Sequence, residues 1–299
     1  MPRIAFLTAG CMLPDAPDRR EDHWEFDLEW NALQPACEAA GLQIEPMVWD
    51  GPEVLTEAFD AYVVGTTWDY AERHGEFLER LAELDRRGVL LNPLRTIAWN
   101  SHKSYLRELE QRGVPVVPTL WREDATEASL QDAFETLGCD EIVIKPQVGA
   151  GAWRQERVRK GAPWPSPDRL PPGTCMVQPF LPRACDEGEF SLVYFDGVFS
   201  HCAQKRPAPG DYRVQSIYGA REVAVDPPAD MRAVARQVLE ATAGPLLYAR
   251  VDLMRDGNTW RLMELELIEP YLYPEQGPHM GMHFANALQR ILQRIAERA

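Results

Sequence analysis

The sequence predicts a protein of mixed α/β and α+β class that is long enough for two or three domain-sized units. Strand-like and helix-like patterns alternate over the first third of the chain, which is typical of a parallel sheet. Further along, strand-like runs are joined by short turns, which is typical of antiparallel hairpins. The 299 residues are 45% hydrophobic and 26% charged, an ordinary composition for a globular protein with a sizeable core.

The first third begins with a short apolar run, 3–8, that suits a buried strand. Apolar residues then recur at helical spacing from Phe26 to Ala40 and stop at Gly41. Further strands are predicted at 43–49, 61–64 and 89–91, and a further helix at 73–87. Because ligands of such sheets usually bind beyond the carboxyl ends of the strands, the loop 66–70 is a candidate binding segment.

The rest of the chain predicts smaller α+β units. Helices are expected at 101–112, 126–137 and about 230–242, together with a C-terminal helix that has an apolar stripe. Strands are expected at 141–145 and 174–180, an extended segment at 114–120, and a surface loop at 161–173. Asp196-Gly197 predicts a hairpin between strands 189–195 and 198–205. We therefore expect an N-terminal α/β substrate domain at 1–98, a small domain at 99–180 and a C-terminal domain at 181–299.

Charge and cysteine usage narrow the class of protein. The formal net charge is -15 and the pI is near 4.9, so a nucleic-acid partner is not expected. Six scattered cysteines without a CxxC pair indicate reduced thiols. The sequence shows neither a signal-peptide pattern nor an apolar run of membrane-spanning length, so we expect a cytoplasmic protein with no membrane partner.

Two strand-like runs near the C-terminus, 248–254 and 259–268, place charged residues at alternate positions. Alternate residues of a strand share a face. The first run contributes Arg250 and Asp252, and the second contributes Glu264 and Glu266. A three-residue turn at 256–258 would set Arg250 opposite Glu264, with Asp252 diagonal to it on the same face.

Three carboxylates on one face repel one another unless a cation lies among them. Oxygen ligands without Cys or His favour Mg²⁺, with Mn²⁺ as a second choice, so Asp252, Glu264 and Glu266 are candidate metal ligands. The alternative is a charged sheet face that only meets solvent. The spacing also puts Leu262 on the acidic face, which favours partial burial.

Lys145 ends a predicted strand and precedes a loop of small residues, 147–152. A lysine and backbone N–H groups so placed can hold phosphate, although the same pattern fits a solvated strand end. Lys103 lies near a helix start, and Lys205 and Arg213 lie on and after a strand. These cations are individually indistinguishable from surface residues.

Segment 177–181 contains Pro179, which lacks a backbone donor and suits a sheet edge able to receive adenine. The same apolar residues also fit a core. Glu189 opens a strand and could accept ribose hydroxyls, or be an exposed strand-edge charge.

The order of these features resembles the ATP-grasp superfamily, which includes D-alanine–D-alanine ligases and glutathione synthetases. The matching positions are Lys103, Lys145-Pro146 with its glycine loop, Gln178 to Leu181, Gly188-Glu189-Phe190, Arg250-Val251-Asp252 and Glu264-Leu265-Glu266. A closer resemblance is to the ligases related to the D-cycloserine-forming O-ureido-D-serine cyclo-ligase. The segments that look like these ligases are Thr67-Trp68-Asp69-Tyr70, Ser200-His201, Gly210 to Gln215 and Met263 to Pro270.

The resemblance implies an ATP-grasp fold whose two C-terminal subdomains clasp ATP. For ATP, it implies that the phosphates are contacted by Lys103 and Lys145, adenine by Gln178, Phe180 and Leu181, and ribose by Glu189. It implies that phosphate is also held by Lys205 and Arg213. It further implies that two Mg²⁺ ions are bound by Asp252, Glu264 and Glu266, and that Arg250 faces the acyl phosphate. Many ATP-grasp enzymes have asparagine where this chain has Glu266, so direct coordination by this residue stays open.

The activity implied is an ATP-dependent ligase of antibiotic or peptide biosynthesis that forms a C–N bond through an acyl phosphate, between two molecules or within one. Substrate selection is expected at Thr67, Trp68, Asp69, Tyr70 and Asn92, which follow predicted strand ends; a packed aromatic loop is the alternative. Small carboxylate and amine substrates and a homodimer are expected. A phosphotransferase and a non-catalytic nucleotide-binding protein are the rival functions.

Overall fold

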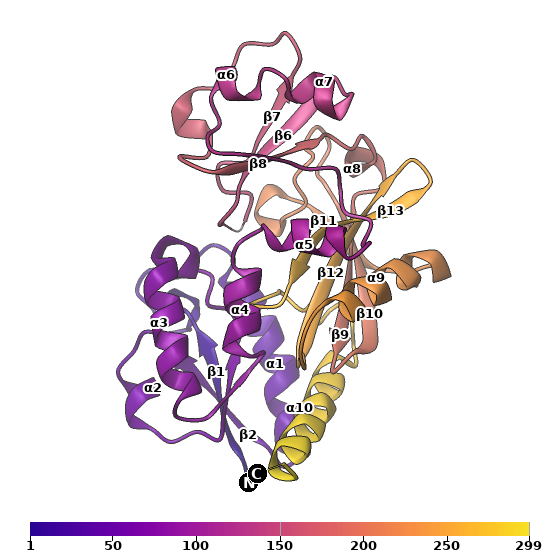
Figure 1. Cartoon of the computed structure of the whole chain (residues 1–299). Coiled ribbons are helices and arrows are strands. Elements are labelled where there is room, and N and C mark those ends of the chain that lie inside the picture. The colour runs from indigo at the N-terminus through magenta and orange to yellow at the C-terminus, as the bar shows by residue number, and fades with distance from the viewer. Residues whose placement is uncertain (150, 299) are drawn as a thin grey trace.

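The computed structural model describes residues 1–149 and 151–298, whose strands form three sheets (Figure 1). The N-terminal sheet is parallel throughout, in the order β2-β1-β3-β4, as the strand–helix alternation predicts. Its elements are β1 (Arg3–Thr8), η1 (Gly10–Met12), α1 (His23–Ala39), β2 (Gln43–Val48), α2 (Glu53–Thr56), β3 (Ala61–Val64), η2 (Tyr70–Arg73), α3 (His74–Asp85) and β4 (Val89–Leu91).

The middle of the chain forms an antiparallel sheet in the order β5-β8-β6-β7 (Figure 1, top). It is reached through α4 (Leu94–Asn100) and α5 (Tyr105–Gln111) and comprises β5 (Leu120–Arg122), α6 (Glu127–Leu130), α7 (Ala133–Leu137), β6 (Glu141–Pro146), β7 (Glu156–Arg159), η3 (Pro167–Arg169) and β8 (Cys175–Pro179). The helix expected at 126–137 is therefore two short helices. β8 lies between β5 and β6, but β5 pairs with Cys175 to Val177, whereas Gln178 and Pro179 pair with β6. The prediction that 177–181 forms a sheet edge is therefore wrong at Val177.

The C-terminal sheet is antiparallel, in the order β11-β10-β9-β12-β13. Its elements are α8 (Arg183–Asp186), β9 (Glu189–Phe195), β10 (Val198–Arg206), η4 (Ser216–Tyr218), β11 (Arg221–Ala224), α9 (Ala229–Ala241), β12 (Tyr248–Asp256), β13 (Thr259–Glu266) and α10 (Met280–Ala296). Val251, Leu253 and Leu265 pack into one core with residues of α5 and α9, such as Leu109 and Val238. The opposite face of β12 and β13 is left for the charged residues.

The C-terminal helix joins the N-terminal unit. α10 runs beside α1 (Figure 1), and Gly281 is needed there because a Cβ at this position would lie 2.0 Å from the Ala32 carbonyl oxygen. Phe284 and Leu288 share a core with Phe6 and Leu33. The first and third units therefore share a hydrophobic core, although they are separated in sequence.

Buried polar side chains also hold these two units together. The Asn92 amide donates to the carbonyl oxygens of Tyr248 (3.0 Å) and Leu267 (2.8 Å) and accepts from the Leu247 N–H (2.7 Å). Asn100 bridges backbone groups of β13 and the residue after it in a similar way. The domain boundary expected at 98 falls inside α4, next to these contacts.

In the part of the chain that the structure describes, none of the helices has the length and apolar character of a membrane span.

Candidate active site

The register of β12 and β13 differs from the predicted one. Asp256 pairs with Thr259 across a two-residue turn, whereas a three-residue turn was expected. Leu253 then pairs with Leu262, but Asp252 pairs with Glu264, so Met263 is the extra residue of a β-bulge.

The turn and the bulge together decide which side chains meet. Arg250 lies opposite Glu266, not Glu264 as predicted, and Asp252 lies directly opposite Glu264. With this turn and no bulge, Arg250 would lie opposite Leu265, because a one-residue slip exchanges the faces of a strand. The bulge therefore keeps the basic and acidic residues on one face. The two-residue turn sets Leu262 opposite Leu253 on the apolar face, contrary to the prediction.

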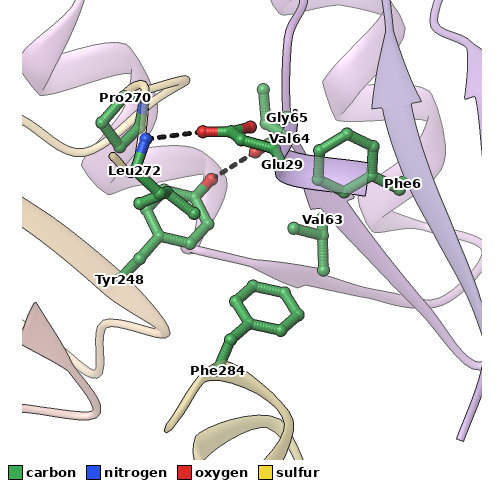
Figure 2. Close-up of a pocket in the computed structure, with 9 residues that line it drawn as sticks. All are labelled: Phe6, Glu29, Val63, Val64, Gly65, Tyr248, Pro270, Leu272 and Phe284. Atoms are coloured by element: carbon green, nitrogen blue, oxygen red, sulfur yellow. Dashed lines mark hydrogen bonds between the residues drawn. The ribbon is translucent and has the colours of Figure 1, made fainter. Parts of the chain in front are cut away.

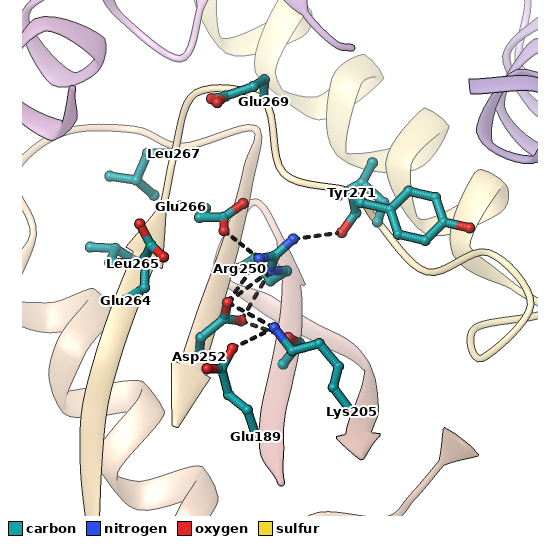
Figure 3. A network of polar contacts seen from close by, with 12 residues as sticks. Glu189, Lys205, Arg250, Asp252, Glu264, Leu265, Glu266, Leu267, Glu269 and Tyr271 are labelled. Atoms are coloured by element: carbon teal, nitrogen blue, oxygen red, sulfur yellow. Dashed lines mark hydrogen bonds and ion pairs between the residues drawn. The ribbon is translucent and has the colours of Figure 1, made fainter. Parts of the chain in front are cut away.

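Cations from neighbouring strands converge on the acidic face (Figure 3). Arg250 donates to Asp252 through Nε (3.0 Å) and Nη2 (2.8 Å), and it also pairs with Glu266. Lys205 on β10 lies 3.2 Å from Asp252 and pairs with Glu189 on β9. The Ser191 hydroxyl donates to Asp252 at 2.6 Å, and Lys103 pairs with Glu264. Each proposed metal ligand is thus held by at least one cation.

These contacts shift the pKa values in opposite directions. Burial would raise the pKa of Asp252, but Arg250 and Lys205 outweigh it and hold this pKa below its ordinary value. Lys103 lowers the pKa of Glu264 in the same way, against burial. Burial raises the pKa of Glu266 to about 8, with Arg250 opposing and the neighbouring carboxylates adding to the rise. Glu266 is therefore the carboxylate least compensated by cations.

The donor set fits a hard divalent cation, although no three metal-binding side chains within the described residues are already arranged as ligands. The face offers carboxylate oxygens alone, with Asp252 and Glu264 directly opposite each other and Glu266 beside them. Mg²⁺ typically uses one or two carboxylates and completes its shell with phosphate and water. The carboxylates now contact lysine and arginine, and a cation entering the site would exchange with these contacts.

The middle sheet places a second lysine over the bulge. Lys145 Nζ lies 3.1 Å from Met263 Sδ, and the Lys103 N–H donates to the Gln147 carbonyl (2.8 Å). The loop after Lys145 turns at Gly149 and at Gly151, whose φ of +62° suits glycine; residue 150 lies outside the described part of the chain. Burial lowers the pKa of Lys145 to about 8, with Glu264 opposing the shift.

We expect Lys145 to make ATP binding pH-dependent. A buried amine with a pKa near 8 loses its charge as the pH rises through that value, so the affinity for ATP falls above about pH 8. Lys145→Arg keeps its charge, because arginine stays protonated throughout this range, and should flatten the profile. The Kd for ATP, measured by calorimetry from pH 6.5 to about 9.5 around this pKa, checks the expectation. Equal slopes for both proteins would contradict it.

The predicted adenine segment combines a buried polar side chain, Gln178, with the apolar side chains of Phe180 and Leu181. Gln178 Nε2 donates to Thr119 Oγ1 (3.0 Å), whereas its buried Oε1 has no partner among the described residues. The Arg157 guanidinium lies over the Phe180 ring, 3.5 Å from the ring centre, and the Phe180 and Tyr212 rings pack edge to face. Leu181 is buried beside Val117 and Met254. An unpaired buried acceptor costs free energy, so Gln178 Oε1 is a candidate for a donor from a ligand.

Glu189 is only 8% exposed, so it is not the exposed strand-edge charge of the alternative interpretation. It follows Gly188, whose φ is +78° and where a Cβ would lie 1.9 Å from the Lys205 carbonyl oxygen. Glycine at 188 therefore lets β9 approach β10 and pair Glu189 with Lys205.

We expect Gly188→Ala to destabilise the protein by about 1–3 kcal/mol or more, because the left-handed backbone and a backbone clash act together. Gly197→Ala is the matched control, since Gly197 has φ +75° with open space around its Cα. Urea unfolding of both variants checks this. A smaller loss at position 188 than at position 197 would contradict the role given to the contact.

The predicted substrate loop, 66–70, packs its aromatic residues against the rest of the protein, and one of its polar groups has no hydrogen-bond partner among the described residues. Trp68 Nε1 donates to the Glu269 carbonyl (3.0 Å), Asp69 accepts from Trp49 Nε1 (2.8 Å), and Tyr70 is buried. Thr67 Oγ1 is buried and has no hydrogen-bond partner within the described residues. The amide of Asn92 is used by the backbone groups described above, so we assign it a structural role.

Arg213 does not reach the acidic face in this structure. Its guanidinium pairs with Asp211 (2.7 Å) and lies 3.7 Å from the centre of the Tyr218 ring. Sequence reasoning also missed several residues beside the cluster, namely Ser191, Glu269, Tyr271 and Tyr273. Only the charged and aromatic run from Glu264 to Tyr273 hinted at the last three.

The chain is similar in sequence to proteins of D-cycloserine biosynthesis. The family model for the N-terminal domain of D-cycloserine synthetase DcsG matches residues 4–92. Cycloserine biosynthesis protein DcsG of Streptomyces lavendulae is 30% identical over 291 residues, which covers 90% of this chain and 92% of that protein.

Solved structures agree with this relationship. A crystal structure of D-cycloserine synthetase DcsG superposes with a TM-score of 0.84 at 28% identity and covers 97% of this chain and 99% of that one. D-alanine–D-alanine ligase from Bacillus anthracis, complexed with ATP, shares the fold with a TM-score of 0.67 at 16% identity, over 100% of this chain and 99% of that one. The chain therefore belongs to the D-cycloserine synthetase subgroup of the ATP-grasp family, and it is an ATP-dependent ligase that forms a C–N bond with release of ADP and phosphate.

Proposed function

We propose that this ligase activates the carboxylate of a small amino-acid-like substrate as an acyl phosphate and closes a ring by attack of an amine-type nitrogen within the same molecule. The relationship to D-cycloserine synthetase over nine-tenths of the chain supports ring closure. The single observation that carries the proposed chemistry is Arg250, a buried cation lying between the carboxylates of Asp252 and Glu266.

The cation pairs of the acidic face suggest how MgATP is received. Lys103 and Lys205 contact the carboxylates of Glu264 and Asp252, which are the proposed metal ligands. When MgATP binds, we propose that these carboxylates turn to the metal and the lysines turn to the phosphates. Asp252 and Glu264 would hold Mg²⁺, or Mn²⁺ in its place, and the ion would supply neutralisation of the charge on the phosphates.

Arg250 is the residue best placed to act on the reacting acyl group. The guanidinium has five donors in a fixed plane. Nε and Nη2 bind Asp252 and Glu266, whereas Nη1 has, among the residues that the structure describes, only the Tyr271 carbonyl at 3.3 Å. Nη1 can therefore donate to an oxygen that gains negative charge, and such a preorganised donor stabilises a transition state more than a ground state.

Substrate binding is proposed at the loop that begins at Thr67. Thr67 has a buried hydroxyl without a hydrogen-bond partner in the described part of the chain, and Trp68 lies against Tyr271. The Asp69 carboxylate accepts from Trp49 and lies 3.8 Å from Arg73. We propose that Thr67 and Asp69 receive polar groups of the substrate and that Tyr70 supports the loop. Asn92 is left out because its amide is occupied.

The remaining nucleotide contacts are proposals of the same kind. ATP would be bound through its phosphates by Lys145, through adenine by Gln178, Phe180 and Leu181, and through ribose by Glu189. Arg213 could hold phosphate only after leaving Asp211 and Tyr218. The homodimer and the cytoplasmic location predicted from the sequence remain predictions.

A screen of ADP release tests this function. We expect MgATP turnover with O-ureido-D-serine and a cyclised product without a stable phosphorylated one. An accumulating phosphorylated product would favour a phosphotransferase. No ADP release with any amino-acid-like carboxylate, in a protein that binds ATP, would contradict catalysis altogether.

A further inference from the structure

The segment after β13 is buried although it has no regular secondary structure. Tyr271, Leu272 and Tyr273 are each at most 6% exposed and form neither helix nor strand. Buried backbone groups outside helices and sheets need partners from elsewhere. The partners of the Leu272 peptide groups come from two distant parts of the chain.

Two side chains hold the two sides of Leu272. The Leu272 N–H donates to Glu29 Oε1 on α1 (2.5 Å), as Figure 2 shows, and the Leu272 carbonyl accepts from His201 Nε2 on β10 (2.8 Å). Because a carbonyl only accepts, Nε2 carries the proton and Nδ1 is an acceptor. The Ser200 hydroxyl, 2.9 Å away, donates to Nδ1 and accepts from His283 Nδ1 at 2.8 Å, which fixes the imidazole.

The neighbours of Leu272 contact the catalytic cations. The Tyr271 carbonyl accepts from Arg250 Nη1 (3.3 Å). The Tyr273 ring centre lies 5.4 Å from the Arg250 guanidinium and 6.0 Å from Lys205 Nζ. Tyr273 has φ +50°, a conformation that costs free energy in a residue with a side chain and needs support from its surroundings.

Glu29 is enclosed too tightly to bind a substrate itself. It lines a cavity of about 10 Å³ together with Phe6, Val63 and Phe284 (Figure 2), which is room for about one water molecule. Burial raises the pKa of Glu29 to about 8 and lowers the pKa of His201 to about 4, so both side chains are neutral near pH 7. They act as a hydrogen-bond acceptor and a donor, not as charges.

We propose that Glu29 and His201 are positioning residues for Arg250, because they fix the Leu272 peptide and thereby hold the Tyr271 carbonyl and the Tyr273 ring against its guanidinium. The inference rests on the proposed role of Arg250. Gly277 supports it, because a Cβ there would lie 2.4 Å from the His201 ring, so the turn after Tyr273 closes directly over the imidazole.

Matched pairs of variants separate positioning from simple filling of space. His201→Gln can place a donor where Nε2 lies, whereas His201→Asn is polar but too short to reach Leu272. Glu29→Gln keeps the acceptor, whereas Glu29→Met keeps length without an acceptor. Glu38→Ala, at an exposed position of the same helix, is the control for a change on α1.

We expect His201→Asn and Glu29→Met to lower kcat about 10-fold to 10²-fold with little change in the KM for ATP, because small misplacements of a catalytic group have effects of this size. The two glutamine variants and Glu38→Ala should stay close to wild type. Equal losses within either pair, a change in KM alone, or a fall in thermal stability without loss of kcat would each overturn the proposal.

A spectroscopic measurement keeps the test independent of activity. The Arg250 Nε–H resonance in arginine-labelled protein should shift in Glu29→Met and His201→Asn but not in the glutamine variants. If the wild-type protein releases no ADP, the proposed function fails. The comparison of Arg250 Nε–H resonances still tests whether Glu29 and His201 position Arg250. Unchanged resonances in all four variants would overturn the positioning alone.

Discussion

Arg250→Lys is expected to lower turnover by about 10²–10³-fold while ATP still binds, because one preorganised donor to a developing oxyanion contributes an effect of this size. Lysine keeps the charge beside Asp252 and Glu266. It lacks the planar fork that binds both carboxylates and still leaves Nη1, which donates to the Tyr271 carbonyl, clear of them. Single-turnover ADP formation and the Kd for ATP check the two halves of this expectation.

Lysine is a better test than alanine at this position. Arg250 is 7% exposed, and its removal would leave Glu266 without its cation and the buried Asp252 with Lys205 alone, at a cost of up to about 3–5 kcal/mol in the free energy of unfolding. Loss of turnover in Arg250→Ala could then reflect unfolding. Turnover of Arg250→Lys near the wild-type value would contradict the proposed role of the guanidinium.

The sequence predicts the strands that are buried and misses those that are exposed. The central strands carry apolar runs or alternation, and they lie where expected. β7 reads Glu-Arg-Val-Arg and β11 reads Arg-Glu-Val-Ala, and each is a four-residue edge strand. Short charged edges carry little apolar alternation, because Val158 alone is buried in β7 and no residue is buried in β11.

The composition of the site is predictable, whereas its pairings are not. Alternation alone places Asp252, Glu264 and Glu266 on strand faces, but the bulge at Met263 decides which of them meet. A bulge depends on how two strands twist against their neighbours, and a single sequence does not record that.

Long-range contacts are hidden for a related reason. Glu264 meets a lysine 161 residues earlier, and Glu29 meets a backbone N–H 243 residues later. Neither contact has a local pattern, since each depends on how whole units pack. Asn92 shows the reverse case, because a polar residue at a strand end, predicted to select substrate, binds backbone groups next to and within the C-terminal sheet.

Asp252→Asn is expected to lower Mg²⁺-dependent ADP release on the order of 10³-fold, because a metal ion stabilises transition-state charge by several kcal/mol. Asp252 is 1% exposed and binds Ser191, Arg250 and Lys205. A neutral amide therefore weakens metal binding and leaves Arg250 with Glu266 and Lys205 with Glu189 as their remaining acidic partners. Titration of activity against Mg²⁺ concentration, with thermal unfolding as a check on folding, measures the effect.

Glu266→Asn is the informative comparison, because it places at 266 the amide that many ATP-grasp enzymes carry. Glu266 is the site carboxylate whose pKa rises to about 8, so its charge is the least supported by neighbouring cations. We expect this variant to keep most of its maximal rate and to need more Mg²⁺. If it loses as much activity as Asp252→Asn, Glu266 is an obligatory ligand. If neither variant changes the Mg²⁺ dependence, the acidic face is not the metal site, and the pairs it makes with Arg250, Lys205 and Lys103 serve stability alone.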